Sequence, residues 1–250
     1  KILNKNKILA PRLYTQRYDK NFIEIEDFGN ETVFKTLKKK GKNKLSYFNR
    51  IIKLLIQIQS IKHRKVKNFR NQNYIIPKYD KKILINEANL FCDWYAKNNL
   101  SKLRKKRFCK KFKKIIKELT LKLKLKDNIF VHRDFHVSNL MSVKNQIGLI
   151  DSQDALIGNK AYDLASLIDD VRLKTSYSFK EKIFKFYTKK QKNLDIKKFK
   201  NDFEILSVLR NLKIIGIFTR LALRDRKKNY LRFIPYTWQL INMRIDQNRT

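Results

Sequence analysis

The 250-residue sequence predicts an α+β fold in which helices predominate. From Phe22 to Glu26, the residues Phe22, Glu24 and Glu26 alternate with Ile23 and Ile25, which is the pattern of a half-buried strand. Over long stretches elsewhere, apolar residues recur every three or four positions, as they do in amphipathic helices. Two short apolar runs near the middle of the chain predict a second hairpin. The expected order is a strand hairpin, helices, a short central hairpin and further helices.

An antiparallel hairpin is expected near the beginning of the chain. Gln16 to Tyr18 and Phe22 to Glu26 flank the sequence Asp19-Lys20-Asn21. Asp and Asn favour tight turns because their side chains bond to nearby backbone groups. The stretch Asp27 to Asn30 has the same turn-forming composition, so we expect the second strand to end there.

Helices are expected on both sides of a basic loop that runs from Lys62 to Lys78. The first helix starts near Leu45, with Ser46 as its predicted cap. Its apolar positions are Ile51, Leu54, Leu55 and Ile58. A second helix is expected from about Lys81 to Asn98, with apolar positions Leu84, Ala88, Phe91, Trp94 and Tyr95. A long third helix is expected from Lys102 to Leu125, with apolar positions Leu103, Phe108, Phe112, Ile115, Ile116 and Leu119. We expect these positions to be buried.

The central hairpin consists of two predicted strands, Asn139 to Val143 and Ile147 to Ile150, joined at Lys144-Asn145-Gln146. A short apolar run, Ile129 to Val131, precedes it. Helical spacing returns at Tyr162. The remaining predicted helices run from about Phe179 to Lys190, Ile196 to Arg224 and Lys228 to Asp246.

Three polar residues around the central hairpin have the order used in phosphoryl transfer. Asp134 lies in His132-Arg133-Asp134, Asn139 follows it by five residues, and Asp151 follows the second strand. In such centres the first carboxylate accepts the proton of an attacking hydroxyl, while the asparagine and the second aspartate hold Mg²⁺ against ATP phosphates. A single Asp or Asn more often caps a turn. The ordered set, with both metal ligands at one end of a hairpin, instead indicates a kinase catalytic centre.

The composition leaves a second class of function open. The formal charge is +38, from 60 basic and 22 acidic residues, which by itself suggests a polyanionic partner. The lysines, however, occur in nearly every segment, together with abundant Ile, Asn, Phe and Tyr. This pattern favours a chain-wide substitution bias and a solvated basic surface over a nucleic-acid groove. A basic nucleic-acid-binding protein therefore remains the disfavoured alternative.

Cysteine use and hydropathy predict a cytoplasmic protein. Cys92 and Cys109 show neither zinc-ligand spacing nor a disulfide framework, which fits a reducing compartment. No apolar run approaches the roughly 18 residues of a membrane span. We therefore expect a soluble protein with no membrane partner.

The chain resembles the aminoglycoside phosphotransferase and choline kinase family, which are small-molecule kinases with a protein-kinase-like two-lobed fold. Within that family it is most similar to bacterial anomeric kinases of N-acetylmuramate and N-acetylglucosamine, which act in cell-wall sugar recycling. The segments that carry the finer similarity are Phe22 to Gly29, Tyr79-Asp80, Asn86 to Tyr95, His132 to Asp170 and Leu212 to Ala222.

The resemblance implies a role for each matching residue, with ATP and Mg²⁺ as cofactors. It implies that Asp134 is the catalytic base and that Asn139 and Asp151 are the Mg²⁺ ligands. It also implies that His132 and Asp163 brace the catalytic loop. The hinge that receives adenine would be formed by Glu26, Asp27 and Phe28.

The acceptor is expected to be a small molecule. Eleven residues separate Asp151 from Asp163, too few for the activation segment that docks a peptide in protein kinases. Asp151-Ser152-Gln153 stands where protein kinases have Asp-Phe-Gly. The predicted substrate residues, chosen as hydrogen-bonding or stacking groups for a sugar, are Asp154, His136, Glu87 and Arg220, with Asp93, Trp94, Arg172 and Asp225 as further candidates.

The two lobes are expected to be unequal. Residues 1–30 would be a remnant of the small lobe, with its hairpin and hinge, and residues 31–250 the helical large lobe. Gly29 is the first glycine and follows the hairpin, so no phosphate-covering loop precedes it. We expect the phosphate-covering strands and the ATP-positioning lysine to lie upstream of Lys1, or the small lobe to be degenerate.

These inferences predict an ATP- and Mg²⁺-dependent kinase that phosphorylates a small-molecule hydroxyl, with the anomeric hydroxyl of an N-acetylated amino sugar preferred. Aminoglycoside, choline and homoserine are the alternative acceptors. A degenerate kinase fold that serves as a binding module is a further alternative, because the small-lobe elements are missing from the sequence.

Overall fold

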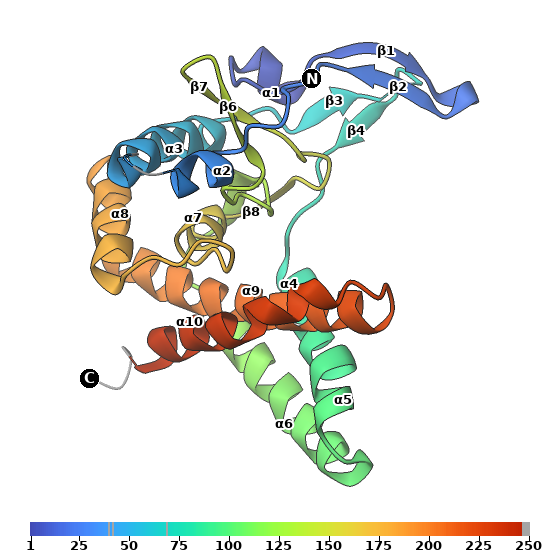
Figure 1. The fold of residues 1–250 in the computed structure, drawn as a ribbon, viewed down its shortest axis with the longest axis vertical. Coiled ribbons are helices and arrows are strands. Elements are labelled where there is room, and N and C mark those ends of the chain that lie inside the picture. The colour runs from blue at the N-terminus through green and yellow to red at the C-terminus, as the bar shows by residue number, and fades with distance from the viewer. Residues whose placement is uncertain (40, 42, 69, 247–250) are drawn as a thin grey trace. The chain divides into compact units, whose positions relative to one another are not determined.

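A computed structural model describes residues 1–246 except 40, 42 and 69. By their internal contacts the residues form two compact units (Figure 1). The first combines residues 1–78, 126–168 and 175–193, and the second combines residues 79–125, 169–174 and the chain from residue 194 onward.

The first unit holds every strand of the described residues. Its elements are α1 (Ile2–Lys5), β1 (Leu13–Arg17), η1 (Tyr18–Lys20), β2 (Phe22–Ile25), α2 (Val33–Lys38), α3 (Lys44–Gln59), β3 (Lys65–Lys67), β4 (Asn73–Ile75), β5 (Asp127–Val131), β6 (Leu140–Val143), β7 (Gln146–Leu149), β8 (Leu156–Asn159), α7 (Tyr162–Ile168) and α8 (Tyr177–Lys189). The strands pair antiparallel as β1–β2, β3–β4, β5–β8 and β6–β7.

The central hairpin, β6–β7, is confirmed. Leu140 pairs with Leu149 and Val143 with Gln146. Lys144 and Asn145 form the turn with positive φ angles of 41° and 57°, the conformation that two-residue hairpin loops need. The early hairpin, β1–β2, is also confirmed as an antiparallel pair. The expectation that its second strand is half-buried was wrong, because all four residues of β2 are exposed.

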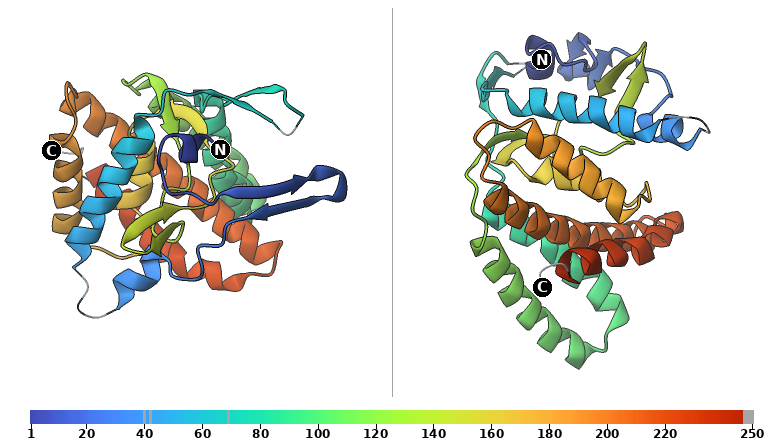
Figure 2. Two further views of the ribbon diagram at one scale, coloured as in Figure 1. Left: turned by 90° about the horizontal axis from the view of Figure 1, so that it is seen from above. Right: turned by 90° about the vertical axis from the view of Figure 1, so that its left-hand side faces the viewer.

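Helices α3 and α8 lie side by side in the first unit (Figure 2). Phe48 of α3 meets Phe179 of α8 edge to face, with ring centroids 5.1 Å apart. The Tyr187 hydroxyl donates to the Gln59 side-chain oxygen at 2.6 Å, which satisfies both polar groups inside the core. Helix α3 begins with Asn43 as its cap, because the Asn43 side chain accepts the N–H of Ser46 at 3.0 Å. The prediction of Ser46 as the cap was therefore wrong.

The second unit is helical. Its elements are α4 (Lys81–Leu90), the π-helical turn η2 (Phe91–Ala96), α5 (Lys97–Asn99), α6 (Lys102–Leu121), α9 (Ile196–Leu223), the 3₁₀ turn η3 (Lys228–Phe233) and α10 (Ile234–Asp246). Helix α9 is the centre of this unit and packs against α4, η2 and α10. No helix among the described residues is long and apolar enough to cross a membrane.

Two further expectations about the elements were wrong, and three short elements were not expected. The predicted loop from Lys62 to Lys78 contains the β3–β4 hairpin, whose three-residue strands are too short to show a period. The predicted last helix is divided into η3 and α10, and Pro235 stands in the first turn of α10, where proline is tolerated. The sequence also gave no warning of α1, α2 or β8, each of seven residues or fewer.

The predicted buried stripe of the long helix, α6, is mostly wrong. Leu103, Phe108 and Ile115 are 83%, 38% and 53% exposed, whereas Ile116 is buried. The helix also ends at Leu121 rather than Leu125. The backbone N–H groups of the residues that follow, Lys124 and Leu125, donate to the carboxylate of Asp202 at 2.8 Å each, and the chain leaves the helix there.

Both cysteines are free thiols in the second unit. Cys92 is buried and Cys109 is half-buried. The pKa of Cys92 is raised to about 12, mainly by burial and secondly by a hydrogen bond with Cys109. Cys92 is therefore protonated near neutral pH and is a poor nucleophile there.

Candidate active site

The candidate catalytic loop, residues 132–139, connects β5 to β6 in the first unit and is fixed at its beginning by one buried carboxylate. Asp163, in the first turn of α7, has no exposed surface. Its two oxygens accept the backbone N–H groups of His132 at 2.7 Å and Arg133 at 3.0 Å. Two backbone donors to one carboxylate constrain the direction in which the chain leaves β5.

The imidazole of His132 connects the loop to the segment before Asp151. Its Nε2 lies 3.0 Å from the backbone oxygen of Ile150, and its side chain is buried. Burial lowers the pKa of His132 below the usual value for an imidazole, so the neutral ring is favoured. His132 is therefore positioned to hold the loop against the segment that precedes Asp151.

Two residues in this region have an unusual backbone. Arg133 and Asp151 have φ angles of +74° and +64°, in the left-handed region that non-glycine residues seldom occupy. Such conformations persist where the surrounding structure fixes them. Here the fixed points are the bonds from Asp163 to the N–H of Arg133 and from His132 to Ile150.

Asn139 brings the two predicted aspartates together. Its side-chain nitrogen donates to the backbone oxygen of Asp134 at 3.1 Å and to the Asp151 carboxylate at 3.2 Å. Because both donors are engaged, the amide oxygen is the atom of Asn139 that is left to bind a cation. The other Asp151 oxygen accepts the side-chain N–H of Gln153 at 2.5 Å.

The donor set fits Mg²⁺. A carboxylate and an amide oxygen are hard ligands, and Mg²⁺ in kinases usually takes one or two protein ligands and fills its other positions with phosphates and water. Among the described residues, no group of three or more His, Cys, Asp and Glu side chains forms a metal cluster. Asn139 and Asp151 would therefore hold the metal only together with a nucleotide.

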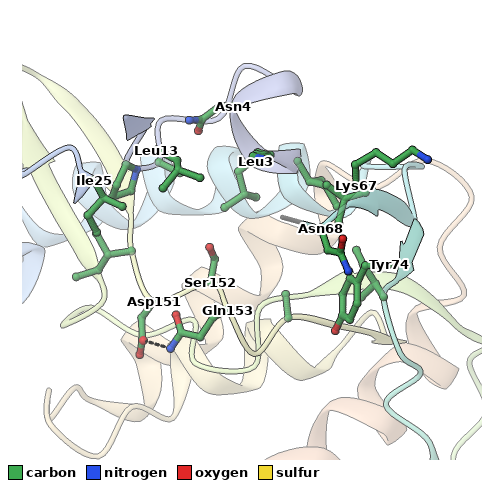
Figure 3. A pocket seen from close by; sticks show the side chains of 18 of the residues that line it. Leu3, Asn4, Leu13, Ile25, Lys67, Asn68, Tyr74, Asp151, Ser152 and Gln153 are labelled. Atoms are coloured by element: carbon green, nitrogen blue, oxygen red, sulfur yellow. Dashed lines mark hydrogen bonds between the residues drawn. The ribbon is translucent and has the colours of Figure 1, made fainter. Parts of the chain in front are cut away.

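A pocket of about 500 Å³ opens beside Asp151, within the first unit. This volume lies in the range of small-molecule sites. Figure 3 shows Leu3 and Leu13 across the pocket from Asp151 and Ser152. Ile25 at the end of β2 and Ile150 before Asp151 add further apolar lining. The pocket is thus apolar over much of its wall, with a candidate metal ligand at its edge.

The predicted hinge residues are near this pocket in sequence but are not among its lining residues. The backbone N–H of Glu26 donates to the backbone oxygen of Arg12 at 2.8 Å. The side-chain carboxylate of Glu26 accepts the backbone N–H of Arg12 at 3.2 Å. Asp27 accepts the N–H of Gly29. The Phe28 ring packs so closely on Gly148 that a Cβ there would lie 2.7 Å from the ring. Their role as an adenine hinge stays a prediction.

Two predicted substrate residues belong to the same unit as the loop. Asp154 is exposed, and its backbone oxygen accepts the Arg133 guanidinium at 3.2 Å. His136 is 6% exposed, and its backbone takes part in the turn between Asp134 and Asn139. This burial favours a packed histidine over one that touches substrate.

The other predicted substrate residues lie in the second unit. Glu87 accepts from the Tyr79 hydroxyl and pairs with Lys213 at 3.0 Å, so its charge is balanced inside that unit. Arg220 and Trp94 are half-buried. Of the remaining candidates, Arg172 pairs with Asp170 at 3.4 Å, Asp225 pairs with Arg224 at 2.7 Å, and Asp93 is exposed. Substrate roles for these residues stay predictions.

The sequence did not predict functional positions for Gln153, Arg133 or Ile150. The Gln153 side chain donates a hydrogen bond to the Asp151 carboxylate. Arg133 has a left-handed backbone conformation. The backbone oxygen of Ile150 is the hydrogen-bond partner of the His132 ring, and Ile150 also lines the pocket. Their proximity in the sequence to the predicted catalytic residues could have identified them, because each lies within two residues of Asp134 or Asp151.

The chain is similar to known proteins. The profile of the phosphotransferase enzyme family matches residues 2–194. The N-acetylmuramate/N-acetylglucosamine kinases of Neisseria meningitidis and Pseudomonas aeruginosa are 27% and 29% identical to this chain over 232 residues. Each alignment covers 90% of this chain, and 67% and 65% of the respective relative. The chain therefore spans about two thirds of the length of these relatives.

A solved structure gives the fold. The ethanolamine kinase of Plasmodium vivax superposes with a TM-score of 0.66 at 14% identity, over 100% of this chain and 72% of that chain. At that identity the likeness concerns the fold alone. It confirms the predicted class, an α+β, mostly helical, protein-kinase-like fold.

Proposed function

The chain belongs to the phosphotransferase enzyme family, and we propose on that basis that it transfers the γ-phosphoryl group of ATP to a hydroxyl of a small molecule. The observation that carries the proposal is the position of Asn139, whose amide bonds to the backbone of Asp134 and to the carboxylate of Asp151. This contact supports the proposal, because it links the backbone of the candidate base to a candidate metal ligand, and phosphoryl transfer requires the base and the metal ligands to lie close together.

Each residue then has a defined task. Asp134 accepts the proton of the attacking hydroxyl. Asp151 and the amide oxygen of Asn139 hold Mg²⁺, which when bound neutralises charge on the phosphate oxygens. His132 and Asp163 position the loop without touching substrate. The pocket lined by Leu13, Ile25 and Ile150 receives the nucleotide. Residues 1–30 would belong to the small lobe and residues 31–250 to the large lobe.

The proposed acceptor is the anomeric hydroxyl of an N-acetylated amino sugar. Support comes from the relatives named N-acetylmuramate/N-acetylglucosamine kinase, which are 24–29% identical over most of the chain. The short interval from Asp151 to Asp163 favours a small acceptor. Aminoglycoside, choline and homoserine remain the competing acceptors.

The catalytic assignment is tested with Asp134→Asn in the full-length protein. The substitution keeps the size of the side chain and removes the proton acceptor, so we expect kcat to fall by about 10²- to 10⁴-fold. MgATP binding, measured by calorimetry, should change little. Asp19→Asn is the matched control, because it removes an exposed carboxylate of the first unit that has no role in the proposed reaction. Undiminished turnover by Asp134→Asn would show that the assignment is wrong.

The acceptor is tested separately, by ATP consumption with a panel of amino sugars and amino alcohols. We expect the largest kcat/KM with N-acetylmuramate or N-acetylglucosamine, and phosphate at the anomeric oxygen by ³¹P NMR. A response to choline or an aminoglycoside alone would refute the sugar assignment and leave the phosphotransferase assignment in place.

A further inference from the structure

Helix α6 is far more basic than the rest of the chain. It has ten Lys and Arg residues and one Glu, a net charge of +9 in 20 residues, where the chain average of +38 over 250 residues gives about +3. Nine of the ten basic residues are exposed. A substitution bias that acts evenly along the chain does not explain this concentration.

Large apolar side chains lie exposed on the same helix. Leu103, Leu121, Ile115 and Phe108 are 83%, 59%, 53% and 38% exposed. Residues three or four apart are neighbours on a helix surface. Phe108 therefore borders Arg104 and Lys111, and Ile115 borders Lys111. Apolar and cationic groups are thus interleaved on the outward surface of α6.

An apolar groove continues this surface inside the second unit. It has a volume of about 240 Å³, and its walls include Phe108, Ile115 and Leu119 of α6, Leu212 of α9, and Trp238 and Ile241 of α10. Aromatic and aliphatic side chains line all of it. Aromatic side chains beside lysines are characteristic of proteins that enter the headgroup region of a bilayer.

We propose that the exposed face of α6 docks on an anionic lipid surface, with its lysines and arginines against the headgroups and its apolar side chains at the acyl boundary. Attraction to anionic lipid contributes with each basic residue near the surface, and burial of Leu103, Phe108 and Ile115 adds the apolar term. A nucleic acid would satisfy the charges but would leave these side chains in water. An anionic bilayer can accommodate both the cationic and the apolar side chains of α6.

This proposal revises the expectation of no membrane partner, since it concerns peripheral contact rather than a span. It does not depend on the proposed phosphotransferase activity, because α6 carries none of the residues assigned to that reaction.

The electrostatic part is tested by co-sedimentation with vesicles of phosphatidylcholine, with and without 30–40% phosphatidylglycerol, at physiological salt. The variant Lys106→Gln/Lys110→Gln/Lys113→Gln/Lys117→Gln removes four exposed lysines from α6. The control, Lys182→Gln/Lys185→Gln/Lys189→Gln/Lys192→Gln, removes four exposed lysines from α8 and the residues after it. Both have the same net charge, so general attraction by a basic protein weakens equally in the two.

We expect binding that requires phosphatidylglycerol and falls at least about tenfold in the α6 variant, on the basis of four lost headgroup contacts. The control should lose less than about threefold. Equal losses in the two variants, or no binding to anionic vesicles by the unmodified chain, would overturn the proposal.

The apolar part is tested with Leu103→Ser/Ile115→Ser, whose circular dichroism and thermal midpoint should match those of the unmodified chain, because both side chains are exposed. We expect vesicle binding to weaken several-fold and quenching of tryptophan fluorescence by brominated lipid to diminish. Binding to polyuridylate should not change. If polyuridylate binds more tightly than the vesicles, and the double variant binds vesicles normally, the partner is a nucleic acid and the lipid proposal is wrong.

Discussion

Asp163 shows how one side chain organises the candidate site. A buried carboxylate is costly unless hydrogen bonds replace its hydration. The N–H groups of His132 and Arg133 supply two such bonds, from residues 31 and 30 positions earlier in the chain. The same bonds satisfy two backbone donors at the start of the loop, which would otherwise be buried without a partner. The carboxylate and the loop therefore stabilise each other.

We predict that Asp163→Ala destabilises the protein by at least about 2 kcal/mol, since each buried donor left without a partner costs about 1–3 kcal/mol. Urea unfolding followed by circular dichroism measures the loss. Asp154→Ala, at an exposed position, should stay within about 0.5 kcal/mol of the unmodified chain. Equal stability of the two variants would contradict a supporting role for Asp163.

Among the elements, α9 depends on a glycine where it crosses the end of α4. A Cβ at Gly216 would overlap the backbone of Leu90 and lie 2.7 Å from the nitrogen of Phe91. Backbone atoms have no rotamer by which to move aside. The crossing also coincides with the start of η2, the π-helical turn. Gly216 is therefore needed for close approach of the two helices, although glycine is a poor helix former.

We predict that Gly216→Ala lowers stability despite the better helix propensity of alanine. The propensity gain is about 1 kcal/mol, whereas overpacking typically costs 1–3 kcal/mol and more against backbone. The expected result is a lower urea midpoint with an unchanged m value. The control Lys197→Ala changes an exposed position in the same helix and should be nearly neutral. A stabilised Gly216→Ala variant would show that the crossing is looser than described.

At the scale of the whole molecule, the residues assigned to ATP and Mg²⁺ all lie in the first unit. A ligand that binds only the folded state stabilises it by about 2.7 kcal/mol at 100 times its Kd. For a chain of this size that corresponds to a rise of about 5–10 °C in the unfolding midpoint.

We predict this rise for saturating ATP with Mg²⁺, and a smaller one after EDTA removes the metal. Asp151→Asn should lose the part of the shift that depends on Mg²⁺ and keep the part due to ATP alone. Differential scanning fluorimetry gives both values, with Asp80→Asn, a helix cap in the second unit, as the control. A full Mg²⁺-dependent shift in Asp151→Asn would refute its assignment as a ligand.

Elements with a sustained local period were predictable. The helices near Ile51, Phe179 and Ile196 and the β6–β7 hairpin are in place, because each shows its spacing over several turns or strand residues. The pairing of β5 with β8 was not predictable, since Leu156 to Asn159 is a four-residue strand that contains glycine and asparagine. Such strands depend on their partner rather than on their own propensity.

The sequence by itself determined the chemistry of the candidate centre. Proton transfer and Mg²⁺ binding demand particular side chains, and Asp134, Asn139 and Asp151 lie within 18 residues around one short hairpin. Only the tertiary structure decided that Asn139 bonds to both aspartates, that Asp163 fixes the loop, and that Leu103 and Ile115 of α6 face outward. These features depend on packing between distant segments, and helical periodicity cannot say how much of an apolar stripe another element will cover.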